Sequence, residues 1–347
     1  MTEDFPVDFT LKAHATLPEP EQCLLHLVEH LREHDGRLEE QEGAFLVSLP
    51  DIQGRIWCED GLLHVDTRCI DAETAYFVKT WLDGVFRYLA GTEPLQIDWE
   101  ENWGAGRLPP SFTILKVEGL QRITSWMMRV TLKCPDVARF DRPDALHVQV
   151  LINFASAAGA AGREPPSPIW RRYTVRAVDR ARSTIDLDVF LHGEAGPGAA
   201  WIAALRIGDL VGVAGPSGGS IGSADRFLIA GDETAVPAIS RILGLIPGDC
   251  RGEVLIEIAD GGERLPLEMP GGFNLTWLAR RKDAASVLEG AVTSFLARRS
   301  TQKSFVWVAC EATVASRIRK QVRTRAQRDR LDHLIAGYWK RGHGASS

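Results

Sequence analysis

The stretch FLIAGDETAVPAISRIL, residues 227–243, decides how the C-terminal part of the chain folds. Its first four residues are apolar, as expected for a buried strand, and residues 235–245 follow with helical spacing. The glycine and acidic residues between them lie at a strand-to-helix junction, where a helix N-terminus can bind the phosphates of a dinucleotide. The glycine spacing G-x-G-x-x-G is absent, so the usual dinucleotide-binding fingerprint is missing.

Strands and helices continue to alternate after this junction. Apolar runs at 254–258 and 305–309 predict two more strands, and residues 284–298 and 312–328 have helical spacing. This alternation is typical of a parallel sheet. We therefore predict an α/β domain with a parallel sheet over residues 223–347.

The hundred residues before the junction have a different pattern. Short strand-like runs broken by turn residues occur at 112–117, 124–132, 146–152, 172–178, 185–190 and 210–214. Several short strands without long helices favour a closed antiparallel barrel. We predict such a barrel over residues 107–222, with the Ala-, Gly-, Pro- and Ser-rich stretch 155–168 as a loop.

The N-terminal residues form a third unit. Helical spacing at 21–33 and 73–89, with strand-like runs at 44–49, 54–57, 62–66 and 95–99, predicts a small α+β domain over residues 1–100 and a linker over 100–110. His26, His30 and His34 share one face of the first helix, a spacing that can bind a metal. They flank the apolar stripe, so we expect a solvated helix face and no metal site.

Composition narrows the classes of function. A net charge of -6 argues against general nucleic-acid binding. The N-terminus lacks the basic start and apolar run of a secretory signal, and no stretch reaches the roughly 20 apolar residues of a membrane helix. The six cysteines include no CxxC pair, which argues against an iron–sulfur cluster and for reduced thiols. We expect a cytoplasmic protein without a membrane span.

The hexamer RRYTVR, residues 171–176, carries the clearest chemical signal of the barrel. A flavin bound outside a dinucleotide fold needs a cation near its pyrophosphate, an aromatic ring against its isoalloxazine and a hydroxyl or backbone group near N5. An R-x-Y-T strand supplies all three, with Arg171 and Tyr173 on one face and Arg172 on the other. An ordinary exposed strand can look the same, so the hexamer needs support from other segments.

Glycine-containing turns supply that support. The segment DVFLHG at 188–193 is followed by turns at 196–198, 208–209 and 215–219. Glycine lets backbone amides approach phosphate oxygens closely. The barrel therefore has several places where the phosphates of a dinucleotide can lie.

Together these segments resemble the siderophore-interacting protein family. The resemblance rests on the RxYT strand, the LHG segment, the GPSGG turn, the GDETAVPAISRIL block and GYWKRG at 337–342, and it covers about residues 110–347. It implies a ferredoxin-reductase-like fold with FAD in the barrel and a nicotinamide nucleotide, NADPH or NADH, in the parallel-sheet domain. The activity that it implies is a ferric-siderophore reductase, which passes electrons from NAD(P)H through FAD and releases ferrous iron.

The resemblance implies cofactor-binding roles by position and assigns no catalytic residue. These positions are Arg171, Tyr173, Thr174 and Val175 on the FAD strand; Asp188, His192 and Gly193 near the flavin and ribityl chain; Gly196 and Pro197 at the pyrophosphate turn; Gly231, Asp232, Glu233, Thr234 and Ala235 on the nicotinamide side; and Trp339 in the tail. Two positions depart from the family pattern. The usual serine after Gly196-Pro197 is missing, and Cys310 stands where the late strand usually has glycine.

An anionic ferric siderophore needs cations at its binding site. The resemblance places the GYW tail near the flavin, so we expect Lys340 and Arg341 to contact the chelate, with Arg176 as a third candidate. The basic run from Arg317 to Arg330 is expected to be mainly a solvated helix face. Siderophore oxygens hold ferric iron, a hard cation, tightly and release ferrous iron more readily.

Several alternatives stay open. The acceptor could be another small molecule or a redox protein, or the chain could be a flavin-binding sensor or scaffold whose first domain binds a partner. Asp260 favours NADH, whereas Arg264, or else Arg280 or Arg281, could contact the 2′-phosphate of NADPH, which the resemblance favours. The siderophore, the role of residues 1–100 and the oligomeric state are not specified by any of these patterns.

Overall fold

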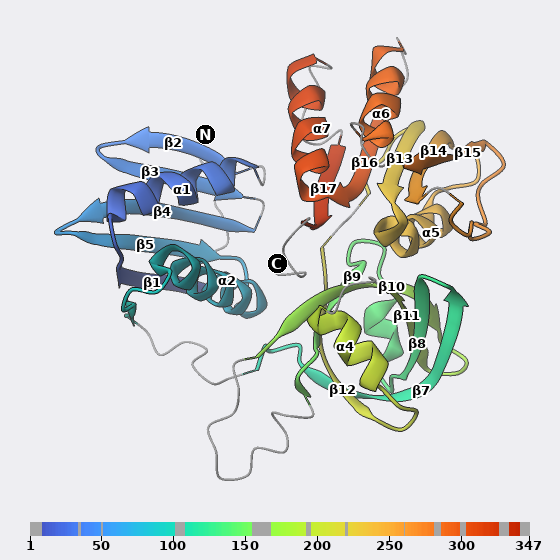
Figure 1. Ribbon diagram of the computed structural model, residues 1–347, viewed down its shortest axis with the longest axis horizontal. Helices are drawn as coiled ribbons and strands as arrows, with labels where there is room; N and C mark the ends of the chain where they lie inside the picture. Colours follow the sequence, from blue (N-terminus) through green and yellow to red (C-terminus); the bar gives the residue numbers. More distant parts are fainter. Residues whose placement is uncertain are drawn as a thin grey trace. The chain divides into compact units, whose positions relative to one another are not determined.

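The computed structural model describes residues 9–33, 36–49, 51–100, 108–154, 168–191, 196–218, 221–259, 261–280, 286–298, 303–325 and 333–340. The chain divides into two compact units between Phe112 and Thr113, named here the N-terminal unit and the C-terminal unit. The C-terminal unit contains both the barrel and the parallel sheet (Figure 1).

The N-terminal unit is an antiparallel sheet of the order β2-β3-β4-β5-β1-β6, with two helices on one face (Figure 1). Leu63 and Val65 of β5 lie in one core cluster with Leu27 of α1 and Phe86 of α2. The elements are β1 (Phe9–Thr16), α1 (Pro20–Glu33), β2 (Arg37–Gln41), β3 (Ala44–Leu49), β4 (Ile52–Glu59), β5 (Leu62–Cys69), α2 (Ala72–Ala90) and β6 (Gln96–Trp99). Strands β1 and β2 were not predicted: β2 has a single apolar residue, whereas β1 was missed although its apolar and polar residues alternate over its whole length.

A row of directly opposed side chains crosses the helix-free face of this sheet. Trp57 of β4 lies opposite His64 of β5, His64 opposite His14 of β1, and His14 opposite Asp98 of β6. The rings of Trp57 and His64 stack at 5.0 Å and those of His64 and His14 lie 5.7 Å apart. His14 Nε2 lies 3.4 Å from Asp98 Oδ2. We call these four residues the N-terminal row.

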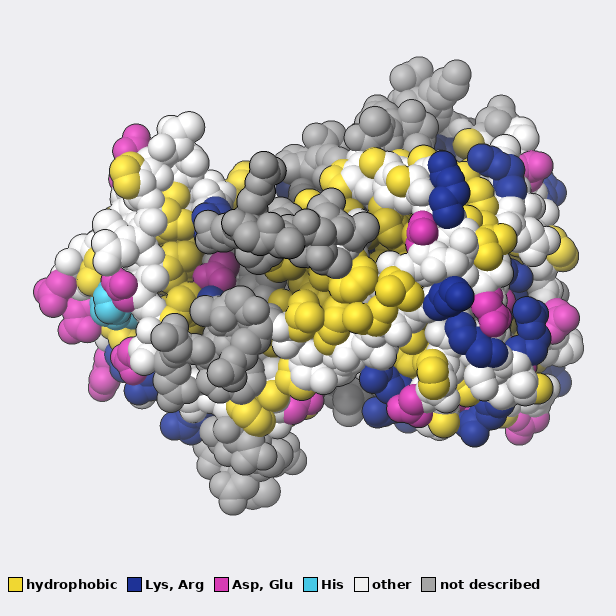
Figure 2. Space-filling view, turned by 90° about the horizontal axis from the view of Figure 1, so that it is seen from below, with side chains coloured by type: hydrophobic (Ala, Val, Ile, Leu, Met, Phe, Trp, Pro, Cys, Tyr) yellow, Lys and Arg dark blue, Asp and Glu magenta, His cyan; other side chains and the backbone are white. Residues whose placement is uncertain are grey.

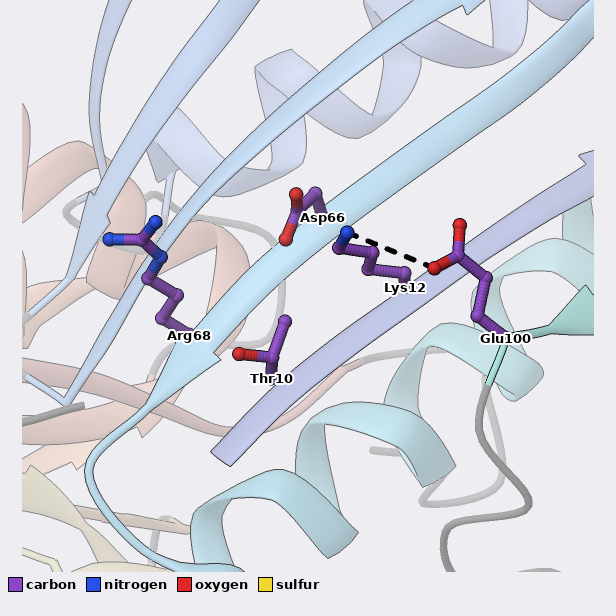
Figure 3. Close-up of a pocket in the computed structure, with 5 residues that line it drawn as sticks. All are labelled: Thr10, Lys12, Asp66, Arg68 and Glu100. Atoms are coloured by element: carbon purple, nitrogen blue, oxygen red, sulfur yellow. Dashed lines mark ion pairs between the residues drawn. The ribbon is translucent and has the colours of Figure 1, made fainter. Parts of the chain in front are cut away.

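A pocket of about 370 Å³ opens on the same unit (Figure 3). Strands β1 and β5 contribute Thr10, Lys12, Asp66 and Arg68, and Glu100 follows β6. Lys12 Nζ lies 3.8 Å from a Glu100 oxygen, and both side chains are well exposed. Exposed pairs of this kind contribute little to stability, about 0–1 kcal/mol. The charged side chains of the pocket therefore lie at the surface and contribute little to the stability of the fold.

The first part of the C-terminal unit is a closed barrel of the order β10-β11-β8-β7-β12-β9, as predicted. Its inward residues, among them Val130, Val148, Val175 and Leu187, form one core cluster. Figure 2 shows hydrophobic side chains gathered on one outer face of this unit. The elements are β7 (Thr113–Thr124), β8 (Met127–Lys133), β9 (His147–Leu151), β10 (Trp170–Asp179), β11 (Thr184–Phe190), α4 (Pro197–Ala204) and β12 (Leu210–Ser217).

The second part is a parallel sheet of the order β15-β14-β13-β16-β17, which confirms the predicted fold class. Helix α5 packs on one face of the sheet, whereas α6 and α7 pack on the other. The elements are β13 (Arg226–Asp232), α5 (Val236–Leu245), β14 (Arg251–Ala259), β15 (Phe273–Arg280), α6 (Val287–Ala297), β16 (Ser304–Glu311), α7 (Ala312–Arg325) and β17 (His333–Trp339). Strands β15 and β17 were not predicted. Within the described ranges, no helix combines the length and apolar character that crossing a membrane requires.

Candidate functional site

The order in which successive strands are added to the sheet reverses at β13, its central strand. Strands β14 and β15 extend to one side of β13, and β16 and β17 extend to the other. Ligands of open α/β sheets bind outside the carboxyl ends of the strands at such a switch point. Gly231 and Asp232 lie at this end of β13, and residues 233–235 form a single 3-10 turn before α5. The predicted nicotinamide-side residues therefore lie together at this switch point.

Gly231 is required by close packing at this point. A Cβ atom there would lie 2.5 Å from Ala235 Cβ and 2.6 Å from the Ala309 carbonyl oxygen, which is too close for any side chain. The nearby Cys310 departs from the family pattern, but it is buried in the cluster beneath α6 and α7. Its side chain consequently packs into the core on that face of the sheet.

The carboxylate of Asp232 is engaged within the protein. One oxygen accepts bonds from the backbone and hydroxyl of Thr234, and the other accepts from Glu311 N at 3.0 Å and Trp339 Nε1 at 2.8 Å. Burial raises the pKa of Asp232 to about 6. Asp232 thus ties β13 to β16 and to the tail strand β17. The predicted contact of Asp232 and Trp339 with a cofactor stays a prediction, and the structure adds that the two side chains bond to each other.

A second charged cluster lies at the ends of β13, β14 and β15. Arg280 donates two bonds to Glu233 and one, at 3.0 Å, to Glu257. Glu257 also accepts from Ser286 Oγ and from Leu288 N at the start of α6. Arg280 is therefore neutralised by two carboxylates and is a poor candidate for a 2′-phosphate. Arg264 is exposed, and Asp260 and Arg281 lie outside the described residues.

The barrel presents a polar outer face beside this sheet. Thr174 of β10 lies opposite His147 of β9, while Val175 and Val148 point into the core. Asp188 of β11 accepts two bonds from Arg129, at 2.7 and 2.8 Å, and lies 4.0 Å from Arg176. The predicted substrate cation Arg176 thus shares its carboxylate partner with Arg129.

His147 connects the barrel to the tail of the sheet domain, and sequence reasoning missed it. Its Nδ1 lies 3.3 Å from Thr174 Oγ1 and its Nε2 lies 3.3 Å from Tyr338 Oη. Burial lowers the pKa of His147 to about 3, with the positive charges of Arg172 and Arg241 adding to the effect. The imidazole is therefore neutral. No short motif marks His147, because its partners are distant in sequence.

Arg241 of α5 was also missed, and it joins the two halves of the unit. Its guanidinium donates to three barrel carbonyls, those of Val175 at 3.0 Å, Phe140 at 2.9 Å and Arg142 at 3.4 Å. The side chain is 7% exposed. Leaving buried carbonyls without such a donor costs stability, so this contact fixes α5 against strand β10 of the barrel.

The RxYT strand fits a bound FAD. The buried Nε of Arg171 has no hydrogen-bond partner within the described part of the chain, and a phosphate oxygen would satisfy it. Tyr173 stacks on Trp201 of α4 with centroids 5.6 Å apart, and burial raises its pKa to about 12, which keeps its hydroxyl protonated. Helix α4 begins after Gly196 at Pro197 without a side-chain cap, which leaves first-turn amides for an anion.

The absence of the usual serine after Gly196-Pro197 goes with close packing at Gly198. A Cβ at Gly198 would lie 2.9 Å from Tyr173 Oη, so glycine allows the tyrosine to approach α4. The segment that was predicted to be a turn is the first turn of this helix.

The remaining predicted positions are partly described. Lys340 is exposed directly after β17, whereas Arg341, His192 and Gly193 lie outside the described residues. In the basic run of α7, Arg319 is buried and donates to the Ile335 carbonyl, and Arg317 pairs with Glu289. That run is therefore only partly the solvated face that was expected. The described residues contain no group of three or more His, Cys, Asp and Glu side chains that could hold a metal ion.

Comparisons with known proteins agree with this architecture. Residues 116–220 match a family model described as siderophore-interacting FAD-binding domain, and residues 224–342 match one described as siderophore-interacting protein. Ferric vibriobactin reductase ViuB of Vibrio cholerae is 32% identical over 231 residues, which cover 62% of this chain and 84% of that protein.

Two solved structures show the same fold. Siderophore-interacting protein SipS from Aeromonas hydrophila has a TM-score of 0.57 and 27% identity, over 67% of this chain and 93% of that chain. Phthalate dioxygenase reductase has a TM-score of 0.50 and 14% identity, over 67% of this chain and 70% of that chain, and so shares the fold alone. The ferredoxin-reductase-like class predicted from the sequence is therefore confirmed.

Proposed function

We propose a function on the premise that the chain belongs to the siderophore-interacting protein family. The chain is an FAD-dependent oxidoreductase that takes electrons from NAD(P)H and reduces ferric siderophore, so that ferrous iron is released. The observation that carries the proposal is the 32% identity to ferric vibriobactin reductase over 84% of its length. The RxYT strand of the barrel and the switch point of the sheet are our candidates for the two sites that this reaction needs.

The residues of the RxYT strand would hold FAD. Arg171 and the uncapped first turn of α4 are the candidates for the pyrophosphate, and Thr174 is the candidate for a hydrogen bond to the flavin ring. Bound FAD supplies an acceptor for the hydride of the nucleotide and a donor of single electrons. The chain's own contribution is to orient the two ligands and to neutralise their charge.

The cations near the tail are the proposed siderophore contacts. Lys340 is exposed directly after Trp339, whose indole is fixed by Asp232. A fixed tail holds Lys340 in one region, and Arg341, the next residue of the sequence, is the second candidate. Arg176 is a weaker candidate because Asp188 lies 4.0 Å from it. The chemistry required is attraction of an anionic chelate.

An anaerobic absorption experiment tests the function. The purified protein should carry flavin, lose its flavin absorbance on addition of NADPH, and regain it when ferric siderophore is added. Flavin that is reduced but is reoxidised only by another acceptor would identify a different reductase. Bound flavin without turnover would identify the sensor or scaffold.

The nucleotide is proposed to be NADPH, with Arg264 at its 2′-phosphate. Arg264 is exposed on the segment after β14, whereas Arg280 is held by two carboxylates. Arg264→Ala should raise the KM for NADPH several-fold, about 1 kcal/mol, and leave that for NADH unchanged, since a charge-assisted bond is lost only with the phosphate. Arg251→Ala, on the opposite end of β14, is the control. Equal effects on both nucleotides would remove Arg264 from the site.

A cytoplasmic location is also proposed. All six cysteines, each within the described residues, are free thiols, as suits a reducing compartment. Cell fractionation tests this location.

A further inference from the structure

Three polar side chains meet where the barrel contacts the tail of the sheet domain. His147 lies between Thr174 and Tyr338, at 3.3 Å from each hydroxyl oxygen. We propose that Thr174, His147 and Tyr338 form the path by which a proton leaves the flavin site. The proposal rests on the proposed function, because it requires FAD beside Thr174.

The proposed reaction must release a proton. NAD(P)H donates a hydride, which carries two electrons and one hydrogen. Two ferric complexes take one electron each and no hydrogen. The balance is therefore NAD(P)H and two ferric ions giving NAD(P)⁺, two ferrous ions and one proton. A site that excludes water needs protein groups to carry this proton away.

The three side chains have the chemistry of a relay. The Thr174 hydroxyl can receive a proton while passing its own to His147 Nδ1, and His147 Nε2 can then pass a proton to Tyr338 Oη. A neutral imidazole has one N–H and one lone pair on opposite edges, so it can transfer a proton by exchanging tautomers. Because the pKa of His147 is lowered to about 3, the ring does not retain the proton as a charge.

The surroundings give the relay a direction and a fixed geometry. Arg172 and Arg241 place positive charge near His147, which disfavours a proton that stays there. Tyr338 is half-buried as a whole residue, and burial raises the pKa of its phenol, so the hydroxyl stays protonated and passes a proton on only by exchanging it. The rings of His147 and Tyr338 meet edge to face at 5.8 Å, and the next residue, Trp339, is held by Asp232. The phenol is thus held in reach of the imidazole.

His147→Gln is the decisive variant. A glutamine amide can still bond both hydroxyls, but it cannot relay a proton by exchanging tautomers. His147→Gln should keep its FAD Kd, measured by flavin fluorescence, and its rate of reduction by NADPH within about twofold. Reoxidation by ferric siderophore should slow by about tenfold to a hundredfold, as general acid–base groups contribute about 10²–10⁴. Added imidazole should restore part of the rate.

Tyr338→Phe is the second variant, and exposed His26→Gln on α1 is the matched control. Tyr338→Phe should also slow reoxidation only, with a changed solvent deuterium isotope effect, and His26→Gln should change neither half-reaction. Unchanged reoxidation in both relay variants, or a parallel slowing of reduction and reoxidation, overturns the relay and leaves His147 a structural residue. A wild-type protein that binds no FAD, or that ferric siderophore does not reoxidise, overturns the proposed function instead.

Discussion

Two histidine-containing sheet faces in this chain have similar local geometry and different surroundings. In the N-terminal row, His14 lies opposite His64, and in the barrel, His147 lies opposite Thr174. The side chains of His14 and Asp98 are 38% and 51% exposed, and no helix covers that face in Figure 1. His147 instead contacts Tyr338 of β17, and Arg241 of α5 places positive charge near it.

The difference shows what happens when other elements cover a polar sheet face: its side chains acquire fixed partners and shifted pKa values. An exposed polar row exchanges its hydrogen bonds with water at little net gain. A covered row must satisfy its donors and acceptors internally, so each partner is specified and each pKa depends on the cover. The predictions below remove or test that cover in order of expected effect.

Removing Arg241 should have the largest effect. Arg241→Ala leaves the carbonyls of Val175, Phe140 and Arg142 without their donor, so we expect the C-terminal unit to lose about 3 kcal/mol. Chemical unfolding monitored by tryptophan fluorescence measures this loss. The control, Arg180→Ala, removes an exposed pair with Asp141 and should cost less than about 1 kcal/mol. Equal losses of stability in Arg241→Ala and Arg180→Ala would show that Arg241 does not hold α5 on the barrel.

Tyr173→Ala should weaken FAD binding about tenfold. The ring that stacks on Trp201 and its hydroxyl are lost together, and an aromatic contact of this kind contributes about 0.5–1.5 kcal/mol beyond its buried area. Flavin fluorescence titration measures the change. Tyr88→Ala, at an exposed position of α2, is the control and should bind FAD normally. Normal flavin content in Tyr173→Ala would move the site away from this strand.

The pH dependence of stability should separate two buried groups. Asp232, with its pKa raised from 3.8 to about 6, makes the folded chain bind the extra proton, so its contribution to stability falls as the pH rises through that window. His147, with its pKa lowered from 6.5 to about 3, makes the unfolded chain bind it, so its contribution rises with pH. The two slopes oppose each other, and each is at most about 1.4 kcal/mol per pH unit.

Single variants should expose one slope each. Asp232→Asn should become more stable with increasing pH, and His147→Gln less stable, when urea unfolding is compared between pH 4 and 6. Slopes of the same sign in both variants would contradict the assignment.

Removing the N-terminal unit, with its exposed row, should have the smallest effect on FAD binding and reduction. A chain that starts at Leu108 lacks the N-terminal row and its pocket, whereas both matched family models lie after that point. We expect its FAD affinity and its reduction by NADPH to remain within about twofold of the full chain. A soluble truncated protein without flavin would show that residues 1–107 support the site.

The fold was largely predictable because its signals are local. The six barrel strands and the core strands β13, β14 and β16 are apolar runs, whose period and length can be read from neighbouring residues. Strand β15 alternates apolar and polar residues over 273–277 and could have been predicted from its own pattern, whereas β17 has no such alternation. Both pair along an edge of the parallel sheet, and for β17 this pairing, more than its own pattern, decides the conformation.

The site was predictable only where a motif stands on one strand or turn. The hexamer at 171–176 and the block at 231–235 were found in this way, and the structure has the first on β10 and the second at the end of β13, both in the C-terminal unit. His147 and Arg241 were missed because their partners lie 27 to 191 residues away. The bond between Asp232 and Trp339 was not foreseen either, because it spans 107 residues.

The contact between His147 and Tyr338 also bears on the order of assembly. It joins residues 191 positions apart, whereas β4 and β5 of the N-terminal unit are joined by a short turn. Contacts across long loops form late, because the entropy of loop closure must be overcome first. Newly folding molecules should therefore pass through a stage in which the barrel is closed and its outer face is still bare. We expect the rate at which refolding protein binds FAD, measured by flavin absorbance, to follow the docking of β17 and not the closure of the barrel.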